Sequence, residues 1–237
     1  DAAEKTPDYK HQTYAQYTTL LQERRGKSPN PAVAGAAPPA PEYLQGAVIA
    51  LDNRSGGILA LVGGRDFEHN EYNRALQARR PLGTAMLPFV YAAAFAKGLF
   101  PGSLVEDSAL DNRTVMIGGT TGILGEWGPE NPDNRYEGPI TAREALAKSK
   151  NGAAVRVGTN AGLEAVTQLI HAAGVESKLR PYPATFLGSS VITLAELARA
   201  YTIFPNDGRR APAPHILDRI EDKEGQVVWK SERSRQR

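Results

Sequence analysis

The chain contains no cysteine among its 237 residues. This absence excludes disulfide bonds, thiol catalysis and cysteine-ligated zinc. It fits a bacterial extracytoplasmic protein without requiring one. Histidine is also scarce, and no two histidines have the i, i+4 spacing of a metal-binding helix. We therefore expect no metal site and no cofactor. The four histidines are His11, His69, His171 and His215.

Long hydrophobic runs and an excess of charge of one sign are missing as well. No run of about 18 or more apolar residues occurs, so the chain itself is not expected to span a membrane. It shows no signal peptide, so if the protein works outside the cytoplasm, its export signal is expected in another part of the gene product. The net charge of +2 gives no electrostatic argument for binding nucleic acid.

Proline, alanine and glycine are concentrated near the start of the chain. Residues 26–42 have the composition of an extended linker. The polar, tyrosine-containing residues before them predict one short helix. We therefore expect residues 1–43 to form an N-terminal segment with a Pro/Ala-rich linker, and residues 44–237 to form the compact domain.

Two β-hairpins are predicted from apolar runs that flank turn-forming residues. Residues 101–138 are rich in turn formers, and only a small hairpin around residues 115–117 is expected there. The predicted hairpins pair residues 46–52 with 58–64 and residues 216–221 with 226–230.

Helices are predicted where alanine- and leucine-rich segments follow capping residues. Two Thr-x-x-Glu sequences have the spacing of a capping box, and Gly98 and Gly174 are typical C-terminal stops. The capping boxes are Thr141–Glu144 and Thr193–Glu196, and the helices are expected over residues 84–97, 145–148, 151–157, 163–173 and from 193 to about 204.

The most informative stretch, residues 73–89, resembles the active-site segment of a penicillin-binding transpeptidase. In that family a glycine precedes a nucleophilic serine, a lysine follows three residues later, and Pro-Phe comes next. Gly83 and Pro88-Phe89 match this pattern, but Thr84 stands at the nucleophile position and Leu87 at the lysine position.

The two replacements remove the reacting pair. Residues at i and i+3 are neighbours on a helix, which places a hydroxyl beside its base. Leu87 cannot accept a proton, and the extra methyl group of Thr84 stiffens its side chain and crowds the attack path. Losing general-base help alone costs roughly 10²–10⁴-fold in rate. The structural alternative is that Thr84 caps the following helix and Leu87 packs in the core.

Four segments resemble class A penicillin-binding proteins in the same order, over about residues 44–230. They are residues 62–67, 72–75, 136–151 and 187–201. The family's S-x-N motif is retained as Ser149, Lys150 and Asn151. The resemblance implies that Ser149 shuttles protons and that Asn151 holds the peptide amide of the substrate. The alternative is that Ser149 and Asn151 only end one helix and begin the next.

The third family motif, K-T-G, is not found. Thr120-Thr121-Gly122 precedes the S-x-N motif, which is the wrong order, and Lys223-Glu224-Gly225 is interpreted as a hairpin turn. The resemblance implies an α+β fold of the transpeptidase/β-lactamase type. A helical region would pack on an antiparallel sheet that is incomplete in this chain. The motif can be lost, cut off or supplied by another chain, and the sequence does not distinguish these.

The leading functional hypothesis is a catalytically inactive transpeptidase-like domain of a peptidoglycan synthesis protein, acting as a scaffold or regulatory module. Its expected partners are a peptidoglycan stem peptide or other cell-wall synthesis proteins, and the family implies a possible upstream glycosyltransferase domain and an extracytoplasmic location. One alternative is a weakly active D,D-transpeptidase or carboxypeptidase that uses Thr84, with Ser149, Lys148 or Lys150 as base, although both lysines are expected to face solvent. Another is non-covalent muropeptide binding through Asn151 and a rim that includes Arg79 and Arg80.

Overall fold

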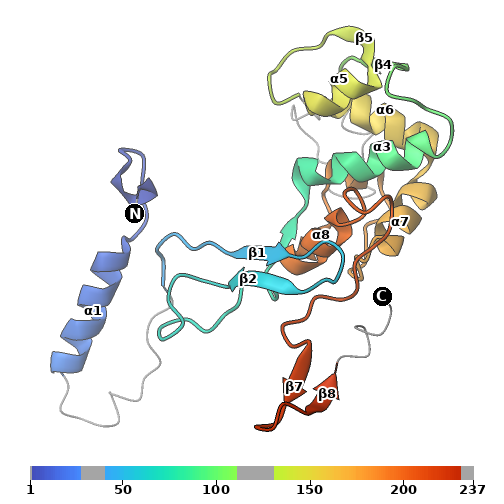
Figure 1. The fold of residues 1–237 in the computed structure, drawn as a ribbon. Helices are drawn as coiled ribbons and strands as arrows, with labels where there is room; N and C mark the ends of the chain where they lie inside the picture. Colours follow the sequence, from blue (N-terminus) through green and yellow to red (C-terminus); the bar gives the residue numbers. More distant parts are fainter. Residues whose placement is uncertain (1, 28–40, 111–130, 231–237) are drawn as a thin grey trace.

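The computed structural model describes residues 2–27, 41–110 and 131–230. It shows a body of packed helices with β-hairpins and short strand pairs around it (Figure 1). In the part of the chain that it describes, the strands form four two-stranded antiparallel sheets. The architecture is therefore α+β, as the sequence predicts. The predicted helical region is present, and the antiparallel sheet beside it is limited to strand pairs.

The core is organised around α3, Leu87–Phe95. Its sequence is apolar on all sides, which is typical of a helix that neighbouring elements cover from several directions. It packs against α6, Asn151–Ala161, and α7, Leu163–Ala172, with α5, Ala142–Ala147, at one end. Fully buried side chains of this core include Met86, Phe89, Val90, Val166 and Ile170.

The first predicted hairpin is confirmed. Strand β1, Val48–Leu51, pairs with β2, Ile58–Val62, in the register Val48 to Val62. Asp52 holds the connecting loop, because its carboxylate accepts hydrogen bonds from the backbone and hydroxyl of Ser55. β1 contacts α8, Leu194–Tyr201, which places the hairpin against the helical body (Figure 1).

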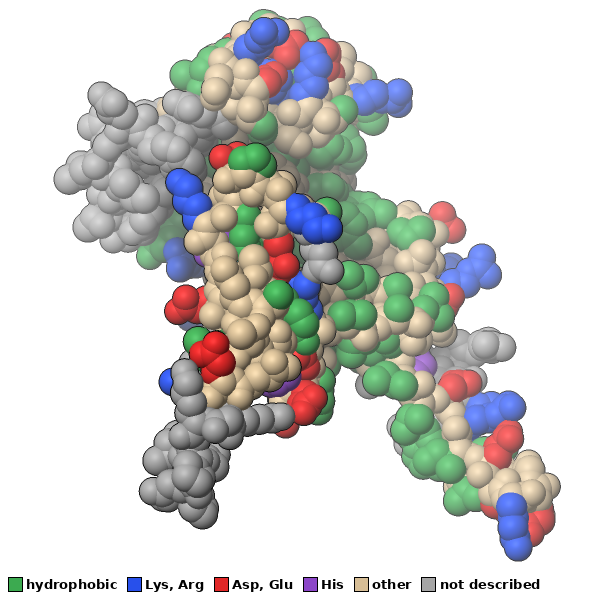
Figure 2. Space-filling view, turned by 90° about the vertical axis from the view of Figure 1, so that its left-hand side faces the viewer, with side chains coloured by type: hydrophobic (Ala, Val, Ile, Leu, Met, Phe, Trp, Pro, Cys, Tyr) green, Lys and Arg blue, Asp and Glu red, His purple; other side chains and the backbone are tan. Residues whose placement is uncertain are grey.

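The second hairpin is also confirmed and stands away from the core. β7, Arg219–Glu221, pairs with β8, Val227–Lys230. Figure 2 shows it as the arm at the lower right, with hydrophobic side chains in view along it. Val228 is 68% exposed and Trp229 46% exposed.

Two strand pairs join segments that are distant in sequence, and both were missed. β3, Arg79–Pro81, pairs with β6, Val191–Thr193. β4, Leu104–Asp107, pairs with β5, Gly138–Thr141, although residues 101–138 were expected to be irregular. Strands this short carry too little periodicity to be recognised, and the partner of each is fixed only by tertiary contacts. The hairpin expected around residues 115–117 lies outside the described residues.

The predicted helices are found with different bounds: α5 begins earlier than expected, at Ala142, and α3 and α8 end earlier, at Phe95 and Tyr201. The first turn of the helix expected from residue 84 is a 3₁₀ turn, η2, Gly83–Met86, which continues into α3. α6 runs four residues past its predicted end, to Ala161, because the apolar face of this helix continues into the core. A further 3₁₀ helix, η3, Pro183–Leu187, was not predicted.

The two capping boxes differ. Thr193 and Glu196 form the full reciprocal box at the start of α8. At α5 only half of the predicted box forms, because Thr141 accepts from the Glu144 backbone whereas the Glu144 carboxylate binds Lys148 instead.

The N-terminal segment contains η1, Ala3–Lys5, and the predicted helix, α1, Tyr14–Lys27. Tyr17 is 1% exposed and packs edge-on against Tyr43, with ring centroids 5.2 Å apart. The Tyr14 hydroxyl donates to Asp66 over 2.9 Å, and the Arg65 guanidinium lies 4.5 Å from the Tyr14 ring centroid. These contacts join the segment to the loop after β2. The predicted linker at residues 26–42 falls almost entirely outside the described residues, and the boundary at residue 43 remains a prediction.

Candidate active site

The turn that carries Thr84, residues 82–87, begins with a close backbone contact. Gly83 has a φ of +57°, and its N–H donates to the Gly188 carbonyl over 3.1 Å. The Leu82 N–H donates to the Ser190 carbonyl, and the Tyr201 hydroxyl donates to the Ala85 carbonyl over 2.8 Å. Three hydrogen bonds therefore hold the segment to residues 188–201.

Thr84 and Leu87 lie one 3₁₀ turn apart, since the Leu87 N–H donates to the Thr84 carbonyl. The side chain of Thr84 is exposed, and Leu87 is 1% exposed and belongs to the core cluster. The expectation that Thr84 caps the helix is wrong. The N-cap of η2 is Leu82 and that of α3 is Met86, and neither carries a side-chain cap.

The S-x-N motif forms the turn between α5 and α6. Ser149 has a left-handed backbone, with a φ of +53°, and Lys150 is the N-cap residue of α6, which Asn151 begins. Both Ser149 and Asn151 are half-buried. Because α6 packs against α3, the turn belongs to a helix that neighbours the nucleophile-position helix. The motif thus does end one helix and begin the next, and this position does not contradict a role in substrate binding.

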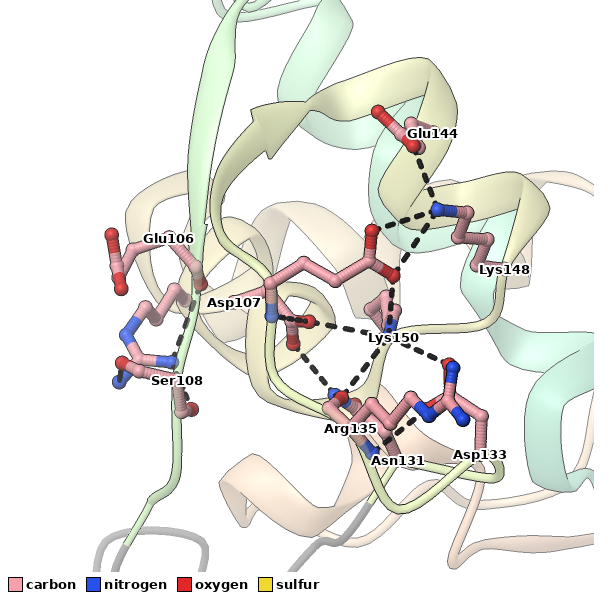
Figure 3. Close-up of polar contacts among 11 residues, drawn as sticks. Glu106, Asp107, Ser108, Asn131, Asp133, Arg135, Glu144, Lys148 and Lys150 are labelled. Carbon is pink, nitrogen blue, oxygen red and sulfur yellow. Dashed lines mark hydrogen bonds and ion pairs between the residues drawn. The ribbon is translucent and has the colours of Figure 1, made fainter.

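The middle residue of the S-x-N motif is buried and not exposed. Lys150 was expected to face solvent, but its side chain is fully buried. Its Nζ lies 2.8 Å from Asp133 Oδ2, 2.9 Å from Glu137 Oε1 and 3.4 Å from Asp107 Oδ2. Figure 3 shows Lys150 at the centre of these contacts. We call Asp107, Asp133 and Glu137 the acidic cradle.

The acidic cradle is itself held by hydrogen bonds. Asn131 donates to Asp107 Oδ1 and to the Arg135 carbonyl, each over 2.7 Å. The Glu137 N–H donates to Asp107 Oδ2, and Lys150 Nζ also donates to the Arg135 carbonyl (Figure 3). The cradle therefore connects the end of β4 with residues 131–137 and the start of α6.

Lys148 lies on the outer side of the cradle and is 42% exposed, as expected. Its ammonium group contacts Glu137 and Glu144, at 2.8 and 2.7 Å. Hydrogen bonds to these carboxylates raise the pKa of Lys148. Burial acts to lower the pKa of Lys150, but the hydrogen bonds to Asp133 and Glu137 outweigh it and raise the pKa above the ordinary lysine value. Both lysines are thus cations whose protons point at carboxylates.

The residues of the acidic cradle were not singled out by sequence. Asp107 is completely buried at the end of β4, and burial together with the charge of Asp107 raises the pKa of Tyr91 on α3. The signal that could have located the cradle is the position of Lys150 between two helices. A lysine that is buried there needs carboxylate partners for its charge. The spacing of the carboxylates gives no hint of which of them would supply these partners.

The arginines of the expected rim, Arg79 and Arg80, lie on β3 and line a groove to which Ser149 and Asn151 do not contribute. Arg79 donates to the Ser177 hydroxyl over 2.6 Å, and Arg80 is exposed on the same short strand. Both line a groove of about 500 Å³ between the start of β1, β3 and α8. The described residues contain no group of three or more metal-ligating side chains placed to hold an ion. No helix in the described ranges has the length and apolar character needed to cross a bilayer.

A family model described as "Penicillin binding protein transpeptidase domain" matches residues 46–236. The chain belongs to this family. Penicillin-binding protein 1A of Neisseria meningitidis serogroup A is 38% identical over 185 residues, which are 78% of this chain and 22% of that protein. Penicillin-binding protein 1A of Pseudomonas aeruginosa is 37% identical over 188 residues, with 79% and 22% covered. The transpeptidase-family chain thus spans about a fifth of the curated relatives it matches.

Solved structures agree with the family assignment. The crystal structure of penicillin-binding protein 1A from Haemophilus influenzae matches with a TM-score of 0.68 at 32% identity, over 79% of this chain and 27% of that one. The PonA1 protein from Mycobacterium tuberculosis, in complex with penicillin V, matches with a TM-score of 0.64 over 93% of this chain and 56% of that one. At 22% identity the second likeness supports the fold alone.

Proposed function

We propose that this transpeptidase-family domain does not form an acyl-enzyme. It would act as a scaffold or regulatory module of a peptidoglycan synthesis protein that works outside the cytoplasm. The observation that carries the proposal is the packing of Leu87 in the core, one turn from an exposed Thr84. A hydroxyl needs an adjacent base to become a nucleophile, and a buried leucine cannot serve as one.

The nearest lysines in sequence do not offer a substitute base. Lys148 contacts Glu137 and Glu144, and Lys150 is enclosed by the acidic cradle. Their raised pKa values favour the protonated form. A general base must instead be unprotonated near neutral pH, so that it can accept the proton of the hydroxyl. This argues against the weakly active enzyme that uses Thr84.

The test is intact-protein mass spectrometry after incubation with a broad-spectrum β-lactam. We expect no adduct on the wild-type chain and none on Thr84→Ala, while an acylating relative treated in parallel gains one β-lactam mass. The variant Thr84→Ser/Leu87→Lys restores the reacting pair and asks whether the rest of the cleft can still support acylation. A stoichiometric adduct on wild type that disappears in Thr84→Ala would overturn the proposal.

A second candidate function is non-covalent binding of a peptidoglycan stem peptide. It is favoured by the ordered S-x-N turn, which keeps Ser149 and Asn151 half-buried at the head of α6 although the reacting pair is gone. In the family, the asparagine of this motif holds the peptide amide of the substrate.

A titration with a D-Ala-D-Ala-terminated peptide tests this candidate. We expect saturable binding that is lost in Asn151→Ala and retained in Asn160→Ala, which makes the same change at an exposed position of α6. Equal binding by both variants would show that Asn151 is not part of the site. If the wild-type chain does not bind the peptide, only the scaffold or regulatory role remains. An upstream glycosyltransferase domain and other cell-wall synthesis proteins remain the partners proposed for the whole protein.

A further inference from the structure

Lys150 is held through its backbone N–H, its backbone carbonyl and its side chain. Its backbone N–H donates to the Ala145 carbonyl over 2.9 Å, which closes α5. Its carbonyl accepts from the Ala154 N–H over 2.9 Å, which opens α6. Its Nζ lies within 2.8 to 3.4 Å of the three carboxylates of the acidic cradle. A residue anchored in this way leaves its two neighbours little freedom.

The burial of this ammonium group requires explanation because an isolated buried charge is strongly unfavourable. Buried ion pairs are often no more stabilising than apolar residues of similar volume, and their best-documented use is to specify one conformation. The contacts of Lys150 come from two separate parts of the chain, the end of β4 and residues 133–137. The ammonium group therefore holds both parts to the head of α6.

The neighbour on one side is strained. Ser149 is one of three non-glycine residues in the described chain with a positive φ. Such a conformation is unfavourable for a residue with a side chain and persists only where the surroundings fix it. The following residue, Asn151, starts α6.

We propose that Lys150 is a positioning residue for the S-x-N turn. Its buried ammonium group, held by Asp107, Asp133 and Glu137, fixes the conformation in which Ser149 and Asn151 are presented to a ligand. The inference concerns the turn itself, and its extension to a stem peptide rests on the second candidate function above. Lys150 acts through its neighbours, because its own side chain is fully buried.

The experiment compares three variants of the 237-residue chain by amide hydrogen exchange and thermal unfolding. Lys150→Met keeps the length of the side chain but removes its charge. Lys150→Met/Asp107→Asn also removes the carboxylate that would remain buried without its cation. Lys148→Met is the matched control, because it removes an ammonium group from the same Glu137 at an exposed position.

We expect protection of the Ser149 and Ala154 amides, which donate to the Leu146 and Lys150 carbonyls, to fall at least about ten-fold in both variants that lack Lys150, as for a locally opened segment. The amides of Val90 and Val166 in the core should keep their protection, and Lys148→Met should behave as wild type. The double variant should regain part of the melting temperature lost by Lys150→Met without regaining the protected turn. If Lys150→Met does not fold, the double variant alone decides.

A role in stability alone would give a different result. The double variant would then recover both the melting temperature and the protection of the turn, or Lys150→Met would leave the protection of the Ser149 and Ala154 amides unchanged. Either result overturns the proposal. Titration with a D-Ala-D-Ala peptide separates this from the proposed function. If wild type does not bind the peptide, stem-peptide recognition fails, while the exchange data still decide the role of Lys150.

Discussion

Gly188 and Gly83 meet backbone to backbone beneath the nucleophile position. The Gly83 N–H donates to the Gly188 carbonyl over 3.1 Å. A Cβ atom added to Gly188 would lie 2.2 Å from the Gly83 carbonyl oxygen, a distance that no side chain can adopt. Gly188 also has a φ of +73°, in the left-handed region that favours glycine.

The variant Gly188→Ala should therefore be strongly destabilised. The added methyl group strains the backbone and displaces the turn before Thr84, which together should cost about 3–5 kcal/mol in the free energy of unfolding. Urea denaturation measures the change. Gly208→Ala is the control, because Gly208 also has a positive φ, +81°, but no atom lies within 4 Å of its added Cβ. That control should lose only about 1 kcal/mol, and equal losses in both variants would refute the contact argument.

The two capping threonines should differ in their effect on stability. Thr193 belongs to a reciprocal box, whereas Thr141 makes only one of the two bonds. Thr193→Ala should cost about 1–2 kcal/mol and Thr141→Ala about 0.5–1 kcal/mol. Urea denaturation of the two variants under the same conditions provides the comparison, and a larger loss at Thr141 would contradict it.

Glu196 should make the stability of the domain dependent on acidic pH. Burial acts to raise the pKa of its carboxyl, but hydrogen bonds from the Thr193 N–H and from Ser177 outweigh it, so the pKa lies below its ordinary value of 4.5. A lowered folded-state pKa gives stabilisation that is complete above the unfolded-state value and is lost as the pH falls through the folded-state value.

Glu196→Gln should consequently be less stable than wild type at pH 7, by about 1–3 kcal/mol for the lost charged hydrogen bonds. The difference should shrink as the pH falls below 4.5. Denaturation curves at several pH values test this, with Glu71→Gln as a control at an exposed position. A difference that stays constant across this range would show that the charge of Glu196 does not contribute.

The N-terminal helix should depend on Tyr17 for its order. An isolated helix of the length of α1 is marginal in water, and Tyr17 is the most deeply buried of the α1 side chains at residues 14–24. In Tyr17→Ala the amides of α1 should exchange nearly as fast as those of an unfolded peptide, while the amides of α3 should keep their protection. Gln22→Ala, an exposed position on the same helix, serves as the control. Retained protection of α1 in Tyr17→Ala would show that other contacts hold the segment.

Elements that depend on neighbouring residues were predictable from the sequence. The hairpin of β1 and β2 follows from two apolar runs around a turn, and the start of α8 follows from the spacing of Thr193 and Glu196. The S-x-N turn was also located correctly, because its residues lie between two helical segments.

The remaining features depend on contacts between distant residues. Nothing near Arg79–Pro81 indicates that residues 191–193 will pair with them. The exposure of Lys150 was predicted wrongly for the same reason, since its partners Asp107 and Asp133 come from other parts of the chain. A charged residue is usually exposed, and only the folded chain shows that this one has enough partners to be buried.

The pairing of β3 with β6 has a consequence for the order in which the chain folds. The two strands are more than a hundred residues apart, so their pairing must overcome a large loop-closure entropy before it gives any stability. Such contacts slow folding, whereas the β1–β2 hairpin and single helices form rapidly. The turn that carries Thr84 directly follows β3, and it should therefore become ordered late, in the same step that brings α8 onto the helical body.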